Sequence, residues 1–370
     1  MSTDNPEGAR EFRWRSESGV PRPTKLRDVD DTLKADAAFR LASEGAALVW
    51  RSDYHNARQL LTAMARRADR KRARAAPTSM LEAFHLHRKH QAERARILGR
   101  LLVPVDGEFR VALPRAPDVH DALVEAWGPP DGAQTLVALR ELLGLIGAHE
   151  WRRKGVEIAA LGANIHPHYG VFSPVRGEYL ELIAKAPLTS QEIAFDIGTG
   201  TGVIGALLAK RGVQRVVATD IDDRAIACAR ENIDRLGFAS QVDVVRADLF
   251  PPGRAPLVVC NPPWLPGRAN TPIERALYDE DSRMLKGFLS GAAEHLVSGG
   301  EAWLVMSDFA ELLGLRAAGE LESWIAGAGL RVIAKDSVRP RHPKAVDRDD
   351  PLHAARSRET TSLWRLAANA

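Results

Sequence analysis

The spacing of apolar residues changes near residue 190. From residue 35 to residue 101 the apolar positions recur at helical intervals, which predicts a series of packed helices. Beyond residue 190, short apolar runs alternate with amphipathic stretches of helical period. Strands that alternate with helices in this way predict a parallel sheet with helices on both faces.

The front region is predicted to be mainly helical, because no alternation of strands and helices is visible in it. Thr78 is expected to cap one helix, with Glu82 nearby. The helices are expected at 38–50, 56–75, 78–102, 119–127 and 133–151, with a turn-containing β segment at 102–115.

The back region is predicted to form a seven-stranded α/β sheet. The strands are expected at 191–198, 213–220, 241–248, 255–261, 301–307, 330–338 and 359–367, and the helices at 201–212, 222–237, 282–300 and 312–329. Only a polar stretch, 338–357, joins the last two strands. We therefore expect them to pair antiparallel, so that the last strand is reversed.

The length of 370 residues suits two domains. Residues 1–30 are polar and are expected to be a disordered tail, 31–160 to form the mainly helical domain, and 161–370 to form the sheet domain. Hydrophobic residues make up 45% and charged residues 27%, as in soluble globular proteins. There is no apolar signal-peptide core and no run long enough to span a bilayer, so a cytoplasmic protein is expected.

Charge is unevenly distributed along the chain. Residues 1–165 carry 27 Lys and Arg against 22 Asp and Glu, whereas the remainder carries 24 against 26. Within 66–100 there are 11 basic residues against three acids. The basic run RRADRKRARA at 66–75 could grip the phosphates of a nucleic acid, or it could be the solvated face of one helix.

The two cysteines, Cys228 and Cys260, lie in apolar surroundings. Neither their spacing nor their neighbours suggest a metal site, and so few cysteines favour a reducing compartment.

A glycine-rich stretch, FDIGTGTGVIG, follows a predicted strand and opens a predicted helix at 195–205. Glycines there allow a tight turn and a close approach of a ligand to the backbone. Residues 200–205 also match G-x-G-x-x-G, and Asp220 lies twenty residues beyond Gly200. The pattern fits a nicotinamide-binding fold or another nucleoside-binding fold. The alternative is a turn that binds nothing.

Two acids follow the next two strands at the same edge of the predicted sheet. Asp220 ends VVATD and Asp248 follows VVRA. Ligands of open α/β sheets bind outside the carboxyl ends of the strands. There Asp220 could accept both hydroxyls of a ribose, and Asp248 could reach an adenine amine. Alternatively, either acid alone could be a loop residue or a helix N-cap.

The fourth strand ends on Asn261, followed by Pro262, Pro263 and Trp264. The prolines remove two donors, so this backbone offers carbonyl oxygens without amide hydrogens. The Asn261 carboxamide oxygen and the Pro262 carbonyl could then accept both hydrogens of one NH2 group. Holding them would help to draw the nitrogen lone pair toward a methyl donor, while Trp264 stacks on the flat group that carries the nitrogen. The alternative is a proline-rich loop that stops a strand.

The back half resembles the class I S-adenosylmethionine-dependent methyltransferases. More narrowly, it is similar to the small methyltransferase domain group, which is marked by (N/D)-P-P-(Y/F/W). The matching stretches are FDIGTGTG, VVATDID, VVRADLF and VVCNPPW, over about residues 165–335.

The resemblance implies a seven-stranded sheet with a reversed last strand, and S-adenosylmethionine as cofactor. It implies that a glycine loop holds the methionine part of the donor, at Asp196, Gly198, Gly200 and Gly202. It also implies that Asp220 holds the ribose, Asp248 the adenine, and Asn261 with Pro262 the acceptor nitrogen. Members modify the side-chain amide of glutamine or an exocyclic amine of a nucleobase. Trp264 departs from the commoner Tyr or Phe.

The segment HPHYGVFSPVRGEYLELI resembles the lead-in of the same group, which covers the donor and lines the acceptor pocket. By this resemblance Phe172 and Arg176 are candidates for substrate binding beside Pro263, with His168 and Tyr169 as further candidates. For the histidines, ordinary loop polarity is the preferred interpretation.

These patterns together predict an S-adenosylmethionine-dependent N-methyltransferase that acts on a ribosomal-RNA base. The close alternative is a protein glutamine N5-methyltransferase, because the helical front region is similar to the docking domain of the release-factor enzymes. A macromolecular substrate is expected, RNA rather than protein. Two further hypotheses are a nicotinamide-dependent oxidoreductase and a silent module that binds RNA or a partner.

Overall fold

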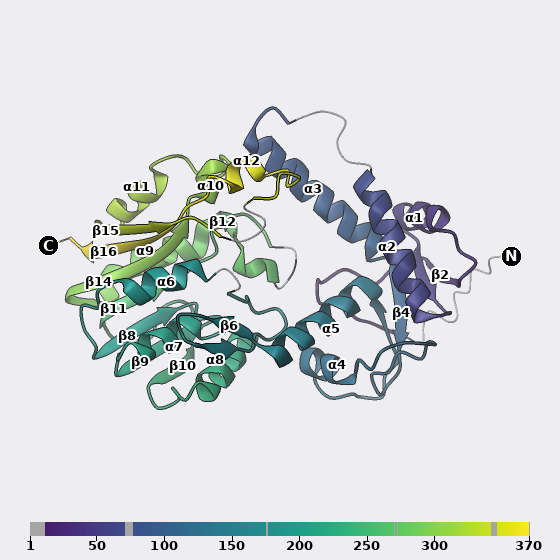
Figure 1. Cartoon of the computed structure of the whole chain (residues 1–370), viewed down its shortest axis with the longest axis horizontal. Helices are drawn as coiled ribbons and strands as arrows, with labels where there is room; N and C mark the ends of the chain where they lie inside the picture. The colour runs from purple at the N-terminus through teal and green to yellow at the C-terminus, as the bar shows by residue number, and fades with distance from the viewer. Residues whose placement is uncertain are drawn as a thin grey trace. The chain divides into compact units, whose positions relative to one another are not determined.

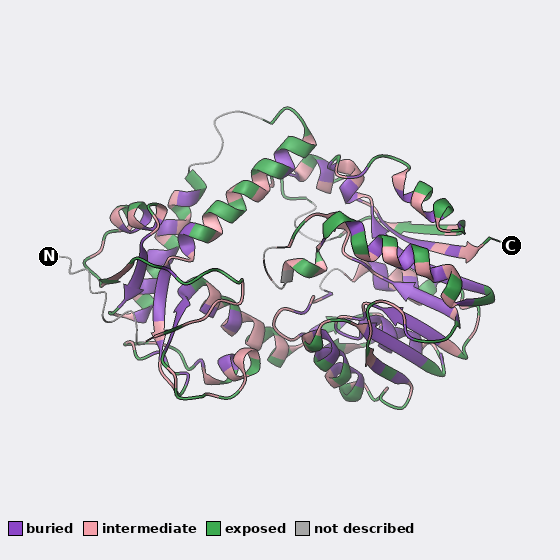
Figure 2. Ribbon diagram, turned by 180° about the vertical axis from the view of Figure 1, so that it is seen from behind, coloured by how far each residue is buried: buried purple, intermediate pink, exposed green. Residues whose placement is uncertain are grey.

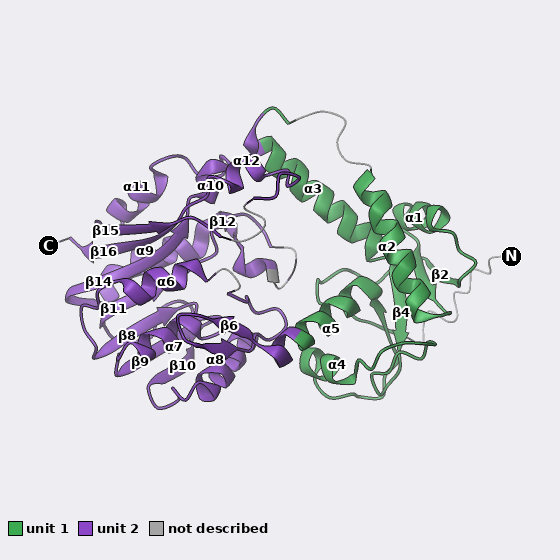
Figure 3. Cartoon of the chain, in the orientation of Figure 1, with its two compact units in different colours: residues 1–78, 82–150 green, residues 79–81, 151–370 purple. Residues whose placement is uncertain are grey.

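The computed structural model describes residues 12–70, 77–174, 177–269, 271, 273–341 and 346–369. The chain forms two compact units, coloured separately in Figure 3. Unit 1 comprises residues 1–78 and 82–150, and unit 2 comprises residues 79–81 and 151–370.

Unit 2 is built on a seven-stranded sheet (Figure 1) with the strand order β10-β9-β8-β11-β14-β16-β15. The strands are β8 (Ile193–Ile197), β9 (Arg215–Asp220), β10 (Val242–Arg246), β11 (Ala255–Cys260), β14 (Leu296–Ser307), β15 (Leu330–Val338) and β16 (Thr361–Ala368). The first five run parallel, whereas β16 is antiparallel to both β14 and β15. The predicted sheet with a reversed last strand is therefore confirmed.

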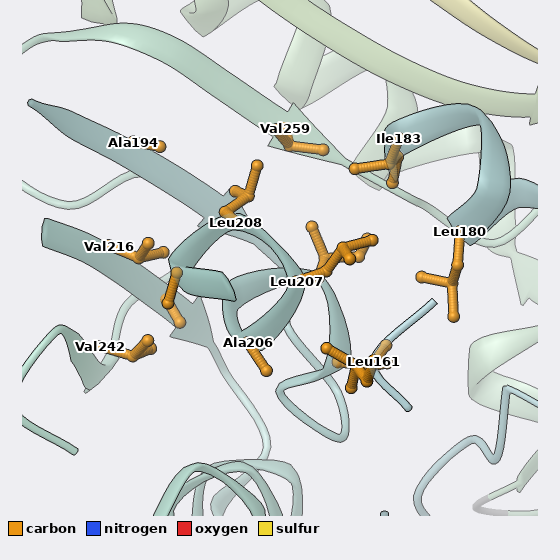
Figure 4. Packing of buried hydrophobic residues seen from close by; sticks show 14 of the residues in the cluster. Leu161, Leu180, Ile183, Ala194, Ala206, Leu207, Leu208, Val216, Val242 and Val259 are labelled. Atoms are coloured by element: carbon orange, nitrogen blue, oxygen red, sulfur yellow. The ribbon is translucent and has the colours of Figure 1, made fainter. Parts of the chain in front are cut away.

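Helices cover both faces of this sheet, because its strands point apolar side chains alternately to the two sides. Along β11, Leu257 and Val259 belong to one core, and Val258 and Cys260 to the other. The first core holds α6 (Glu178–Lys185), α7 (Val203–Lys210) and α8 (Asp223–Arg235), and the second holds α9 (Arg283–His295) and α11 (Glu320–Gly327). Figure 4 shows α7 and α6 packed against the strands, and Figure 2 shows the buried residues that line the sheet.

Short elements complete unit 2. They are the hairpin strands β6 (Val156–Ile158) and β7 (Ala163–Ile165), the paired strands β12 (Leu265–Pro266) and β13 (Tyr278–Asp279), the 3-10 turns η2 (Ile273–Ala276) and η3 (Glu280–Ser282), and the helices α10 (Phe309–Leu312) and α12 (His353–Arg356).

The described residues of unit 1 form five helices, but the centre of the unit is a five-stranded sheet with the order β1-β5-β4-β3-β2. The strands are β1 (Arg13–Trp14), β2 (Leu26–Val29), β3 (Ala47–Trp50), β4 (Leu101–Val105) and β5 (Thr135–Ala138), and the helices are α1 (Ala35–Ser43), α2 (Tyr54–Arg70), α3 (Met80–Leu98), α4 (His120–Trp127) and α5 (Leu139–Lys154). β2, β3 and β4 run parallel, with helices between them. The front domain is thus α/β, and the expected absence of strand–helix alternation was wrong.

Three further predictions for the front region need correction. The helix expected at 133–151 begins with β5, because Thr135–Ala138 pairs with β4, and α5 starts only at Leu139. The single helix expected at 38–50 is α1 followed by β3, because Gly45 adopts φ 95° and breaks the helix. The disordered tail expected at 1–30 contains strands at 13–14 and 26–29, and residues 1–11 lie outside the described part. The second half of the basic run at 66–75, residues 71–75, also lies outside the described residues.

Candidate active site

The glycine loop joins β8 to α7 at the carboxyl edge of the sheet. Gly198, Gly200 and Gly202 have φ values of 71°, 56° and 81°, which L side chains rarely adopt. A Cβ on Gly198 would lie 2.3 Å from the Met284 methyl group, and one on Gly202 would lie 3.2 Å from the Ala229 backbone. The sequence therefore needs glycine here for both conformation and space.

Asp196 lies beneath this loop and is fully buried. Its Oδ2 accepts hydrogen bonds from Thr199 Oγ1 at 2.6 Å and from the Gly205 backbone N–H at 2.9 Å. Burial raises the pKa of Asp196 to about 6, although both hydrogen bonds oppose the rise. Its Oδ1 is buried and has no hydrogen-bond partner among the described residues. A buried acceptor of this kind is a place for a donor group from a ligand.

Asp220 lies next to the loop, as the sequence predicts. Its Oδ2 accepts the Gly200 N–H at 3.0 Å, and its Oδ1 accepts the Asp222 N–H at 3.0 Å. Burial raises the pKa of Asp220 against the effect of these bonds. Each carboxylate oxygen retains a second lone pair, so the side chain can still accept from a ligand. The adjacent Ile221 is 56% exposed and offers an apolar surface beside the acid.

Asp248 lies at the same edge but has a different environment. Its side chain is 61% exposed and forms an ion pair with Arg283 at 3.1 Å. The next residue, Leu249, has φ 73°, and its carbonyl accepts a hydrogen bond from Thr219 Oγ1 at 2.5 Å. The backbone that carries Asp248 is thus fixed to β9, while the carboxylate itself engages an arginine.

Asn261 follows directly after β11, with Pro262 buried and Pro263 half-buried. Trp264 Nε1 donates to Asn261 Oδ1 at 3.0 Å. Its ring also packs on the edges of both cores of unit 2. Trp264 therefore contacts the asparagine directly, a contact that the sequence argument, which assigned it to stacking, did not anticipate.

The lead-in segment runs along α8 toward the carboxyl edge of the sheet. His166 N donates to Asn232 Oδ1 at 2.7 Å, and Val171 packs on Ala225 and Cys228. The Arg224 guanidinium lies 5.8 Å from the Tyr169 ring centroid. Phe172 is half-buried. Arg176, a predicted substrate residue, lies outside the described residues.

His168 belongs to an ion-pair cluster on α8. Its Nε2 lies 2.7 Å from Glu231 Oε2, which also accepts from Arg152 at 2.6 Å, and Arg235 pairs with Oε1 at 2.7 Å. Burial would raise the pKa of Glu231, but the hydrogen bonds from His168, Arg235 and Arg152 outweigh it and lower the value to about 2. This cluster anchors the lead-in segment to α8.

Three residues of this region escaped the sequence argument: Tyr179, Asn232 and Met284. Tyr179 is 3% exposed, and burial raises the pKa of its phenol, against the effect of the Asn261 side chain. Asn232, which is 1% exposed, donates to the Thr201 carbonyl at 3.0 Å and so joins the glycine loop to the lead-in segment. Asp279 caps the start of α9, where Met284 lies, through the Met284 and Leu285 N–H groups at 3.0 and 3.1 Å. The only signal in the sequence was their proximity to the motifs.

Comparison with protein families favours one of the two nucleoside-binding interpretations of the glycine loop. Residues 163–318 match the model of the methyltransferase small domain. The chain carries a methyltransferase small domain. The match covers the glycine loop, both strand-end acids and the NPPW stretch, so this domain belongs with the class I S-adenosylmethionine-dependent methyltransferases rather than with nicotinamide-dependent oxidoreductases.

Relatives of the small methyltransferase domain act on different substrates. The chain is 30% identical over 154 residues to a tRNA1(Val) (adenine(37)-N6)-methyltransferase of Bacteroides thetaiotaomicron, covering 40% of this chain and 64% of that protein. It is 39% identical over 93 residues to a release factor glutamine methyltransferase of Cereibacter sphaeroides, covering 24% and 34%. The chain thus spans less than two thirds of the length of either relative.

Among solved structures, a methyltransferase from Pyrococcus furiosus matches 60% of this chain and 98% of its own chain, at 20% identity and a TM-score of 0.42. None of the described helices is long and apolar enough to cross a membrane. Within the same residues, no group of three or more His, Cys, Asp or Glu side chains could hold a metal ion.

Proposed function

We propose that this protein is an S-adenosylmethionine-dependent N-methyltransferase and that its acceptor is an exocyclic amine of a ribosomal-RNA base. The observation that carries the proposal is the edge of the unit 2 sheet, where the glycine loop, Asp220 and Asn261 follow neighbouring parallel strands. Ligands of open α/β sheets bind at this edge.

The residues of the edge fit the proposed donor. The glycine backbone leaves room for a close approach, and Oδ1 of Asp196, which has no partner among the described residues, is an acceptor for a donor group. Asp220 would accept the ribose hydroxyls, and Ile221 offers an apolar surface for the adenine. Asp248 would accept from the adenine amine, which requires Arg283 to share or release its carboxylate. When bound, S-adenosylmethionine supplies an electrophilic methyl group on a positively charged sulfur.

Asn261 and Pro262 are proposed to bind the acceptor. Their two carbonyl oxygens would accept the hydrogens of one NH2 group and make its nitrogen lone pair more available. As the N–CH3 bond forms, the S–CH3 bond breaks, and the nitrogen then releases one proton to water. Because no strong base is needed, the contribution of the chain is alignment and preorganised dipoles.

An RNA base is favoured over a protein glutamine by two features. Trp264 offers a broad aromatic surface for a flat base, which would have to leave its stack to reach it. In the front part, 66–100 is rich in basic residues, and we propose unit 1 as the substrate-recognition domain. Protein glutamine stays the second candidate, because a release factor glutamine methyltransferase is among the relatives.

The donor half of the proposal is tested by thermal unfolding with S-adenosylhomocysteine or NADH. A ligand that binds the folded state raises the melting temperature. S-adenosylhomocysteine should raise it and NADH should not. A rise with NADH alone would contradict the proposal, and a rise with neither would favour a silent module.

A further inference from the structure

Helix α2 of unit 1, which Figure 1 labels, has an apolar side and a basic side. Its buried residues are apolar or aromatic: Tyr54, Ala57, Leu60, Leu61, Met64 and Ala68. Its exposed residues are all polar or charged: His55, Arg58, Gln59, Thr62, Arg66, Asp69 and Arg70. In a helix of about 3.6 residues per turn the two sets lie on opposite sides. The exposed side of α2 thus carries three arginines, one acid and no apolar residue.

The arginines of α2 differ in whether the fold pairs them. Arg67 Nε donates to Asp36 Oδ1 at 2.5 Å and so joins α2 to α1. Arg58 and Arg66 form no ion pair within the described residues. The pKa of Asp36 is lowered chiefly by the hydrogen bond from Arg67, and Arg70 contributes less. The helix dipole favours cations in the last turn, but Arg58 and Arg66 lie before that turn.

The one acid on the exposed side of α2 is already paired. Asp69 Oδ1 accepts a hydrogen bond from Arg94 Nε of α3 at 3.1 Å. Together α2 and α3 carry eight Lys and Arg against three Asp and Glu. The exposed residues of α3 include two acids beside two Lys or Arg, so that side is balanced. The unbalanced positive charge of this helix pair therefore lies on α2.

Acids of unit 1 gather at the carboxyl ends of its parallel strands. Asp30 and Asp31 follow β2, Asp53 follows β3, and Asp106 follows β4. Because these three strands run parallel, their carboxyl ends meet at one edge of the sheet. Ligands of open α/β sheets bind at such an edge, but here its carboxylates oppose the phosphates of a nucleic acid. The basic side of α2 is the better place for a polyanion.

We propose that the exposed side of α2, defined by Arg58, Arg66 and Arg70, binds backbone phosphates of the RNA substrate; this inference rests on the proposed function. A guanidinium can donate two parallel hydrogen bonds to one phosphate. Contacts of this kind position a nucleic acid and do not read its sequence. The phosphate-binding side of α2 therefore supplies affinity for RNA, and the choice of the base is left to unit 2.

The lack of apolar side chains on this side of α2 favours RNA over an acidic protein. Protein interfaces take most of their binding energy from a few well-packed anchors that are desolvated in pockets. The exposed residues of α2 include no aromatic or aliphatic side chain that could be such an anchor. A phosphate backbone needs only positive charge and hydrogen-bond donors.

The test is the triple variant Arg58→Gln, Arg66→Gln, Arg70→Gln. Filter binding with radiolabelled ribosomal RNA from a strain lacking the gene measures affinity between about 50 and 200 mM salt, where phosphate contacts weaken steeply. Each lost contact should lower the slope of log affinity against log salt by about 0.7 to 0.9, so the variant should lose about two units of slope. In methyl transfer, the KM for RNA should rise at least about tenfold while kcat stays within about twofold.

The matched control removes the same formal charge from arginines that the fold pairs: Arg51→Gln, Arg67→Gln, Arg94→Gln. Arg51 forms an ion pair with Asp28 at 2.8 Å, and the other two are described above. The control should keep the salt slope and the KM of the wild type, although its melting temperature should fall. An equal loss of slope in both triple variants would mean that overall charge attracts RNA, and it would overturn the inference. So would an unchanged slope in the variant of the exposed arginines.

Poly-L-glutamate is the probe for an acidic protein partner. At an equal concentration of charges it should displace ribosomal RNA at least about tenfold less effectively, because it has fewer condensed counterions to release. Equal competition would overturn the assignment of RNA. Failure of the proposed function is distinguishable, because the wild type would then transfer no methyl group to RNA. Failure of this inference alone would leave that transfer intact, with a normal KM in the variant of the exposed arginines.

Discussion

Two acids lie near the carboxyl ends of parallel strands: Asp220 of unit 2 is the last residue of β9, and Asp53 of unit 1 follows the end of β3 by three residues. In unit 1, the Arg115 guanidinium donates to both oxygens of Asp53 at 2.6 and 2.7 Å, and the His55 N–H donates to Oδ1 at 2.8 Å. In unit 2, each oxygen of Asp220 accepts one backbone N–H that the structure defines. The oxygens of Asp53 are thus occupied by an arginine and a backbone N–H, whereas each oxygen of Asp220 keeps room for one more hydrogen bond.

The difference lies in the turn that the acid faces. Asp220 faces a loop whose three glycines have positive φ, and this loop overlies the buried Asp196, whose Oδ1 is unpartnered among the described residues. Asp53 instead starts α2 directly and lies beside the polar turn of Asp31 and Ser52, which hydrogen-bond each other. A strand-end acid indicates a ligand site only when a glycine loop leaves backbone and space beside it.

The largest effect on turnover is expected when the proposed acceptor-binding asparagine of unit 2 is removed. Asn261→Ala should lower kcat roughly 100- to 1,000-fold, the usual range for removing one preorganised dipole. Binding of S-adenosylhomocysteine should persist, because the glycine loop is untouched. Asn56→Ala in unit 1, which loses the bond to Asp31, is the matched control and should turn over normally. Steady-state methyl transfer checks both.

Gly198→Ala and Gly45→Ala together test whether ligand binding depends on the free space at Gly198 as well as on its positive φ. The new Cβ would have to adopt φ 71° and would meet the Met284 methyl group at 2.3 Å, so affinity for S-adenosylhomocysteine should fall at least about tenfold. Gly45→Ala in unit 1 imposes a similar strain at φ 95° with nothing within 4 Å. It should lower the melting temperature and leave the affinity unchanged. Calorimetric titration distinguishes these outcomes, and equal losses of affinity would contradict the assignment.

Asp220→Asn and Asp53→Asn test the comparison between the two acids directly. Asp220→Asn should weaken S-adenosylhomocysteine binding about tenfold, the lower end of the usual cost of losing hydrogen bonds to a charged group. Asp53→Asn removes the carboxylate whose pKa the Arg115 side chain lowers, so it should lower the melting temperature without affecting binding. The comparison fails if both variants bind the ligand as the wild type does.

The smallest effect is expected at Glu231, an acid of unit 2 whose two oxygens both contact basic side chains. Its pKa is about 2 in the folded chain, below the ordinary value of about 4.3. The stabilisation is therefore complete above that ordinary value and is lost as the pH falls toward 2. The melting temperature of Glu231→Gln should lie below that of the wild type at pH 7, and the gap should shrink below about pH 4. A gap that does not change with pH would contradict the ion-pair account.

The sequence predicted unit 2 better than unit 1 for a physical reason. In unit 2, β8 and β11 are five and six residues long, mostly apolar, and are followed by the turn signals Gly198 and Pro262. In unit 1 the strands are two to five residues long. β3 follows α1 so closely that Ala47–Trp50 continued the helical spacing of apolar residues, and only Gly45 marked the break.

The residues of the candidate site could likewise be predicted only in part. Asp196, Asp220 and Asn261 could be predicted because each ends a recognisable strand. Tyr179 and Met284 could not, because their roles depend on how α6 and the start of α9 pack in three dimensions. Trp264 was found from its motif, but its hydrogen bond to Asn261 depends on a loop that local sequence does not determine.

The most direct test of the central claim is methyl transfer to fractionated extract. Purified protein is incubated with radiolabelled S-adenosylmethionine and extract from a strain lacking the gene, and the label is then counted in RNA and in protein. We expect label in ribosomal RNA with the wild type and at least about a hundredfold slower labelling with Asn261→Ala. Label in protein would replace the acceptor with glutamine, and label in neither fraction, or equal label with Asn261→Ala, would contradict the account.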